Sequence, residues 1–316
     1  MSQWPDIPYA RWAPSGASLH MWAQIVGKFR MSLAPWINHS WQATFYVNAR
    51  GLTTSLIPGP TRGYEVVFDF VDHQLVVMTT DGVTRRLPLR DGSVADFHTA
   101  FIELLRGLGA PTDLHDRPNE VADPVPFAYQ TAAGRYDPDA ARDFWQALVA
   151  IDAVFKTFRT GFLGKVSPVH LFWGSFDLAV TRFSGRPAPL HPGGIPALPD
   201  RVTREAYSHE VSSAGFWPGG GGIDEPAFYS YAYPAPEGFR GAPNVPAEAF
   251  YSDALGEFIL PYDAVRRAAE PERLLLGFLQ STYEAAAVLA GWDRPALECP
   301  LGEPGVPRPL LGDLNT

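Results

Sequence analysis

The groups in this chain that could do chemistry include a histidine beside a carboxylate, within SHEVSSAGFWPGGGG at residues 208–222. A zinc peptidase places His-Glu-x-x-His on a helix, so that two imidazoles share one face. Here Ser213 stands where the second histidine would be. Alternation of residue types around His209 predicts a strand, on which His209 and Glu210 point to opposite sides of a sheet. We therefore expect His209 to act without Glu210.

The glycine run at residues 219–222 is not a phosphate loop of the Walker type. Such a loop needs Gly-Lys followed by Ser or Thr at the start of a helix, and neither is present. Asp224 and Glu225 follow the glycines and would repel a phosphate. The run predicts a flexible turn that is able to act as a lid.

The segment from residue 170 to residue 186 carries further candidates. As one strand, it places His170 and Arg182 on a mostly apolar side, typical of a core face or a cavity wall. Trp173, Ser175 and Asp177 fall on the other side, which is typical of a helix-packed face or a polar pocket.

Two arginines near the end of this segment form a candidate anion clamp. Arg182 and Arg186 bracket Ser184-Gly185, a spacing that would suit a carboxylate or a phosphate of the substrate. Ordinary surface arginines are the alternative.

A metal site is a second hypothesis for the same region. Neighbouring antiparallel strands would bring His170 and His209 together, and Asp177 or Glu205 would complete a set of histidine and carboxylate ligands. A divalent metal is therefore one candidate cofactor, whereas the cofactor is otherwise unknown because no nucleotide or haem-attachment motif is present. His39 is the pseudo-symmetric candidate ligand, because Pro, His and Trp recur about 130 residues later, around His170.

Other candidates are a lone carboxylate and a row of tyrosines. Glu284 lies in an otherwise apolar helical segment, where burial would suit it to general acid–base catalysis and exposure to solvent is the alternative. Tyr229 and Tyr231 share one face of a predicted strand and, with Trp173, would line the wall of a substrate pocket. Packing at an interface between two copies of the chain explains the tyrosines equally well.

The elements that must position these residues predict an α+β fold with two similar halves. Each half reads as a helix, about four antiparallel strands and a helix, which suggests an internal duplication. The first helix is predicted at residues 18–34, amphipathic and capped by Ser18, and Asp81-Gly82 predicts a hairpin turn. Ser93 and Asp137 are the predicted caps of two later helices. The predicted division is a first half at 1–110, a proline-rich connector at 111–136, a second half with the candidate site at 137–295, and an irregular tail at 296–316.

Three segments resemble those of an uncharacterised bacterial family that is known only as a domain of unknown function. They are SPVHLFWGSFDLAVTRFSGR, REAYSHEVSSAGFWPGGG and FLQSTYEAA. The resemblance extends over nearly the whole chain. It implies membership of that family and brings no activity with it.

Composition narrows the class of protein further. The 316 residues carry a net charge of −9, which argues against a nucleic-acid partner. A single cysteine excludes an internal disulfide, and no apolar run is long enough to span a membrane, so we expect a cytoplasmic protein with no membrane partner. The favoured function is a small-molecule enzyme with its pocket in the second half and with His170 and His209 as acid–base groups or metal ligands. Hydrolase, lyase and oxygenase chemistry are all open. The alternatives are a non-catalytic small-molecule binding protein and a homodimeric structural or interaction protein.

Overall fold

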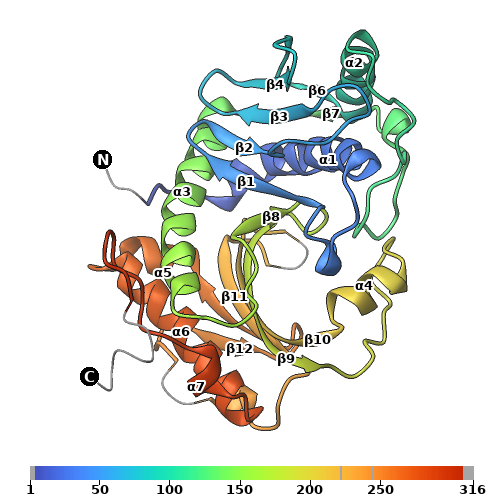
Figure 1. Ribbon diagram of the computed structural model, residues 1–316. Coiled ribbons are helices and arrows are strands. Elements are labelled where there is room, and N and C mark those ends of the chain that lie inside the picture. The colour runs from blue at the N-terminus through green and yellow to red at the C-terminus, as the bar shows by residue number, and fades with distance from the viewer. Residues whose placement is uncertain (1–3, 221–222, 243–244, 309–316) are drawn as a thin grey trace.

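The computed structural model describes residues 4–220, 223–242 and 245–308, and its backbone is drawn in Figure 1. One antiparallel sheet of eleven strands runs through both halves in the order β12-β13-β11-β10-β9-β8-β1-β2-β3-β4-β5, and β6 and β7 form a separate pair. The strands are β1 Thr44–Asn48, β2 Gly51–Thr53, β3 Tyr64–Asp69, β4 Gln74–Thr79, β5 Thr84–Pro88, β6 Gly92–Ser93, β7 Ala133–Gly134, β8 His170–Phe172, β9 Asp177–Pro187, β10 His209–Trp217, β11 Ala227–Tyr233, β12 Phe250–Ser252 and β13 Glu257–Pro261.

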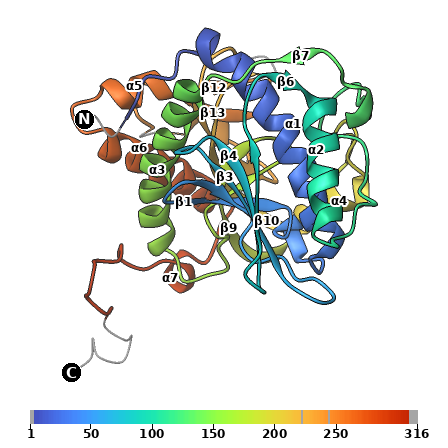
Figure 2. The same ribbon diagram turned by 90° about the horizontal axis from the view of Figure 1, so that it is seen from above.

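Helices cover much of this sheet. They are α1 Tyr9–Leu33, α2 Val94–Gly107, α3 Pro138–Thr160, α4 Asp200–Ala206, α5 Tyr262–Arg267, α6 Pro271–Leu289 and α7 Arg294–Leu297, with 3₁₀ turns η1 Asn38–Ser40, η2 Phe127–Tyr129 and η3 Phe239–Gly241. Helix α1 packs between α2 and α3, as the view from above shows (Figure 2). Within the described ranges, no helix has the length and apolar character needed to cross a membrane.

The α+β class is confirmed, and the two halves share one sheet rather than forming two. Their boundary is the pairing of β1 with β8, in which Thr44 lies opposite Phe172. From this centre the first half runs outward as an antiparallel meander of five strands. The second half contributes six antiparallel strands, and at its outer edge β13 lies between β11 and β12. The first half gains β2, a short strand that the sequence patterns did not predict.

The recurring Pro, His and Trp residues do not occupy equivalent positions in the two halves. Trp41 lies three residues before β1, whereas Trp173 directly follows β8. His39 lies in the turn η1, whereas His170 is the first residue of β8. The matched residues therefore occupy different elements, and an internal duplication is not confirmed.

Helix α1 also differs from its prediction. It begins at Tyr9 rather than at residue 18, and Ser18 lies in its interior, where its hydroxyl donates to the carbonyl of Pro14 at 3.4 Å. All residues from Trp22 to Arg30 are buried, so the helix is enclosed rather than amphipathic. Its polar residues must therefore find partners inside the molecule, because a buried polar group without a hydrogen bond is costly.

Local turn and cap chemistry is confirmed at three positions. The Asp81-Gly82 turn joins β4 to β5, and Gly82 adopts a left-handed φ of 87°, which favours glycine. Ser93 caps α2 in a reciprocal capping box with Asp96. Asp137 caps α3 ahead of a proline in its first turn.

The segment predicted as one long strand from His170 is instead a hairpin. β8 ends at Phe172 and β9 begins at Asp177, after a tight turn in which the amide of Phe176 donates to the carbonyl of Phe172 at 2.9 Å. The turn changes which side chains share a face. His170 lies opposite Ala179 and shares its side of the sheet, whereas Arg182 points to the other side. The predicted grouping of His170 with Arg182 is therefore wrong.

Candidate active site

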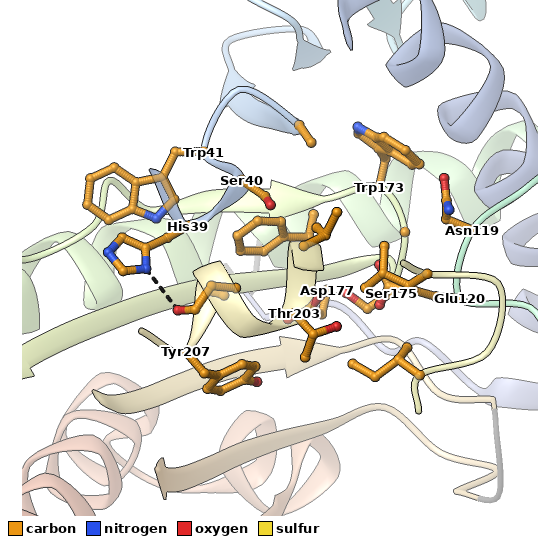
Figure 3. Close-up of a pocket in the computed structure, with 18 of the residues that line it drawn as sticks. His39, Ser40, Trp41, Asn119, Glu120, Trp173, Ser175, Asp177, Thr203 and Tyr207 are labelled. Atoms are coloured by element: carbon orange, nitrogen blue, oxygen red, sulfur yellow. Dashed lines mark hydrogen bonds between the residues drawn. The ribbon is translucent and has the colours of Figure 1, made fainter. Parts of the chain in front are cut away.

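A pocket of about 780 Å³ lies on one face of the central strands. Its floor is made by alternate residues of β9, Asp177, Ala179, Thr181 and Phe183. The turn η1, helix α4 and the connector around Asn119 cover it, so both halves build it (Figure 3). The volume suits a small organic molecule.

The acidic part of the pocket is centred on Asp177, the first residue of β9. Its side chain is buried and accepts hydrogen bonds from the hydroxyls of Ser175 and Tyr229. Burial raises the pKa of Asp177, and the two hydroxyl donors oppose that shift because they stabilise the carboxylate. Burial has the larger effect, so the pKa of Asp177 is raised overall, and the two neighbours fix its side chain in position.

Glu120 approaches this carboxylate from the connector. Its side chain lies against Gly174, where an added Cβ would overlap the carboxyl group. Figure 3 shows Glu120, Ser175 and Asp177 gathered on one side of the pocket. Burial raises the pKa of Glu120 to about 7, the negative charge of Asp177 adds to the rise, and the charge of Lys28 opposes it. Across the described chain Glu120 has no hydrogen-bond partner, so this carboxyl group is available to a ligand.

Glu257 at the start of β13 is a third carboxyl group on the pocket wall. Burial raises its pKa to about 7, and the charge of Asp177 contributes to the rise. Three carboxyl groups around one cavity repel one another as anions, so protons are shared among them near neutral pH.

Hydroxyl groups and aromatic rings form the remaining wall. Tyr207 and Tyr231 are joined by a hydrogen bond of 2.8 Å between their hydroxyls. Thr181 and Ser213 are joined in the same way at 2.8 Å. Trp173 contributes a buried ring. Such a wall offers apolar area and hydrogen bonds to a polar organic ligand.

The opposite part of the pocket carries the imidazole of His39. His39 donates from Nδ1 to the carbonyl of Ala206 at 2.8 Å and accepts from the Nζ of Lys165 at 2.7 Å. Burial lowers the pKa of His39, and the positive charge of Lys165 lowers it further. His39 is thus a neutral imidazole with a defined tautomer. Its ring centroid lies 6.0 Å from that of His209.

Backbone strain gathers around this pocket. Non-glycine residues with positive φ are uncommon, and strained conformations cluster at functional sites. His39, Ser40 and Glu120 line the pocket with φ of 61°, 59° and 59°. Phe176, with φ of 60°, sits in the turn that presents Asp177. Packing of the surrounding structure must hold these conformations in place.

Several residues predicted for the site do line the pocket. Tyr229, Tyr231, Trp173 and Asp177 face the cavity, as does His39. The alternation of tyrosines along β11 places Tyr229 and Tyr231 on the same side as the β9 floor.

Arg182, predicted to bind substrate, does not line this pocket. It lies on the opposite side of the sheet, fully buried, with its guanidinium 3.6 Å from the ring centroid of Phe158 and 4.3 Å from that of Tyr283. Its Nη2 donates to the carbonyl of Phe158 at 2.5 Å. The prediction failed because the β8–β9 turn reverses the parity on which it depended.

Arg186 and Glu284 also lie outside the pocket. Arg186 is exposed, pairs with Glu210 at 2.6 Å and donates to the carbonyl of Ala290 beyond the end of α6. Glu284 is half-exposed on α6, accepts from Gln280 at 2.8 Å and lies 3.7 Å from Arg294. Neither the predicted anion clamp nor a buried acid at Glu284 is formed.

The predicted metal site is not assembled either. His209 pairs with Pro187 at one end of β9, ten residues from Asp177 at the other. His170 is 1% exposed and sits among the rings of Trp41, Tyr46 and Phe172, where burial lowers its pKa to about 3. Within the described part of the chain, no three His, Cys, Asp or Glu side chains are grouped to hold a metal.

Residues that the sequence patterns did not single out complete the pocket: Lys28, Asn119, Glu120, Tyr207 and Glu257. Glu120 was assigned to a proline-rich connector, and Lys28 to an amphipathic helix with an exposed face. One signal was available. A connector this long between two helices is uncommon in a compact protein unless it is functional.

Comparison with known proteins identifies the family of this chain but assigns no activity to it. Residues 4–299 match a family described as "Family of unknown function (DUF5996)". No curated protein and no solved structure matches the chain. Any statement about function must therefore be argued from the chemistry of the pocket. The match spans nearly the whole chain, which belongs to the family of unknown function DUF5996.

Proposed function

We propose that this protein is an enzyme that carries out general acid–base chemistry on a small organic molecule held in the pocket. Asp177 and Glu120 transfer the protons, and Tyr229 and Tyr231 hold the substrate. The observation that carries the proposal is the meeting of two differently held carboxyl groups at one cavity. Asp177 is fixed by two hydroxyl donors, whereas Glu120 has no such partner among the described residues.

The difference between the two environments supports separate roles. A catalytic acid or base works best with a pKa near the working pH, and burial raises that of Glu120 to about 7. The hydroxyl donors of Asp177 stabilise its carboxylate form against the rise in pKa that burial causes, and we assign Asp177 the role of the base. Two carboxyl groups whose surroundings differ in this way are the usual basis of an acid–base pair.

The experiment compares consumption of small molecules by variants. An extract of small metabolites is incubated with the wild-type protein, with Asp177→Asn and with Glu120→Gln, and followed by mass spectrometry. We expect the wild-type protein to consume at least one compound and each variant to slow its consumption by about 100-fold or more. Circular dichroism confirms that the variants are folded.

Arg182→Lys is the matched control, because Arg182 lies on the other face of the sheet and is expected to leave turnover unchanged. A compound that binds tightly to all variants and is never converted would overturn the proposal that the protein is an enzyme and would favour a binding protein. An unaltered rate in both carboxyl variants would equally overturn the assignment of Asp177 and Glu120.

A further inference from the structure

Lys28 lies at the same end of the pocket as the carboxyl groups. It comes from α1, lines the cavity and is only 4% exposed. Its Nζ lies 5.0 Å from the ring centroid of Trp173 and donates to the side-chain oxygen of Asn119. A buried lysine normally pairs with a carboxylate. Within the described ranges, no carboxylate lies within 4 Å of this amine, and Asn119 is its hydrogen-bond partner.

The charge around Lys28 argues against a role in binding an anion. The ionisable groups that act on Lys28 are the carboxyls of Glu120 and Asp116. Asp177 in turn acts on Glu120. An anionic ligand placed beside Lys28 would also meet these carboxylates, which would repel it. An uncharged electrophile meets no such penalty.

We infer that Lys28 is a covalent nucleophile that forms an imine with an aldehyde or ketone substrate. The inference rests on the proposed acid–base function and names the substrate class of that site. A desolvated amine next to proton-transferring groups is the arrangement that Schiff-base chemistry requires. Burial lowers the pKa of Lys28 to about 8, so about a tenth of the amine is neutral at pH 7.

The step balances without any further reactant. The neutral amine of Lys28 attacks the carbonyl carbon, forming a carbon–nitrogen bond while the carbonyl oxygen takes a proton from Glu120. Glu120 then takes a proton from the nitrogen and gives it to the hydroxyl group, which leaves as water when the carbon–oxygen bond breaks and the nitrogen lone pair forms the carbon–nitrogen double bond. The protonated imine returns its last proton to Glu120. The products are one imine and one water molecule, and hydrolysis reverses the sequence.

The chain provides its own reference for testing this chemistry, since it contains only three lysines, Lys28, Lys156 and Lys165. Lys156 is exposed and paired with Asp152 at 2.6 Å, and Lys165 donates to His39. The wild-type protein is incubated at pH 7 with glycolaldehyde or with benzaldehyde, and each imine is reduced with sodium cyanoborohydride. Peptide mass spectrometry then measures the rate of labelling at each lysine.

We expect Lys28 to be labelled at least about tenfold faster than Lys156, because burial lowers the pKa of Lys28 and leaves about a tenth of its amine neutral at pH 7. Lys28→Arg retains the charge and the donor to Asn119, and it should lose this label while leaving the other two lysines unaffected. Labelling of Lys28 at the rate of Lys156, or more slowly, with both aldehydes would overturn the inference. That result would mean that Lys28 only anchors the connector through Asn119.

The experiments distinguish failure of the imine inference for Lys28 from failure of the proposed acid–base function. If Lys28 is not labelled but Asp177→Asn still abolishes consumption of a metabolite, the acid–base proposal stands without the imine. If Lys28 is labelled rapidly but neither carboxyl variant changes consumption, the lysine is reactive and the roles of Asp177 and Glu120 are wrong.

Discussion

Tyr229 on β11 reaches across β10 to donate a hydrogen bond to Asp177 on β9. Its ring passes over Gly215, which pairs with Tyr229 on one side and with Ala179 on the other. A Cβ at position 215 would overlap the tyrosine ring. The absence of a side chain in the middle strand therefore allows two outer strands to form one polar contact.

This contact should tune the acidity of Asp177. Tyr229→Phe removes a donor that stabilises the carboxylate, so we expect the pKa of Asp177 to rise further. The measurement is the carbonyl stretch of protonated aspartic acid, followed by infrared difference spectroscopy as the pH is changed. Tyr231→Phe is the control, because its hydroxyl bonds to Tyr207 rather than to Asp177. Equal titration curves for the two variants would show that Tyr229 does not hold Asp177.

Two helical glycines should respond in opposite ways to alanine. A Cβ at Gly27 in α1 would lie 2.5 Å from Nε1 of Trp173, whereas nothing lies within 4 Å of a Cβ at Gly277 in α6. Gly277→Ala should increase the free energy of unfolding by about 0.5–1 kcal/mol through helix propensity. Gly27→Ala should decrease it by about 1–3 kcal/mol because Trp173 must move. Urea unfolding measures both, and stabilisation by Gly27→Ala would contradict the packing of Trp173 on α1.

Stability should depend on pH through Glu257. Burial raises the pKa of its carboxyl from 4.5 to about 7, so the folded state binds a proton more tightly than the unfolded state does. The resulting stabilisation is complete below pH 4.5 and is lost as the pH rises to about 7. Glu257→Gln removes this dependence and should gain about 1–2 kcal/mol relative to the wild type at pH 8, after allowance for solvent in the pocket.

Thermal unfolding between pH 4.5 and pH 8 measures this effect. The matched control is the exposed Glu237→Gln, which should leave the slope of the melting temperature against pH unchanged. A wild-type slope that persists in Glu257→Gln would place the titrating group elsewhere, with Glu120 the next to test.

Arg182 should matter to stability and not to the pocket. Arg182→Lys replaces a planar guanidinium stacked between Phe158 and Tyr283 by an ammonium that cannot stack in the same way. We expect a loss of about 1–3 kcal/mol in the free energy of unfolding, measured by urea titration. The metabolite consumption should remain at the wild-type rate, and a loss of turnover in the folded variant would restore Arg182 to the site.

Much of the fold could be predicted because its signals are local. Capping residues, the Asp81-Gly82 turn and alternating apolar residues act within a few positions of the chain, so Ser93 and Asp137 identify the starts of α2 and α3. The same alternation placed Tyr229 and Tyr231 on one side of a strand. Parity, however, is lost at an unpredicted turn. The four residues between Phe172 and Asp177 form a turn and not a continuous strand, so Arg182 lies on the face of the sheet opposite to the one expected.

By itself the sequence determined the α+β class, the family resemblance, the strand character of His209 and the tyrosine row, because each depends on short-range pattern. Only the tertiary structure decided which groups meet. Glu120 comes from a connector, Lys28 from a helix enclosed by its neighbours, and Asp177 from the first position of β9. Their meeting depends on one continuous sheet and on chain segments far apart in sequence, whose closure no local pattern encodes. The predicted metal site of His170 and His209 failed for the same reason. His170 lies opposite Ala179 on β9, whereas His209 lies opposite Pro187 at the far end of that strand.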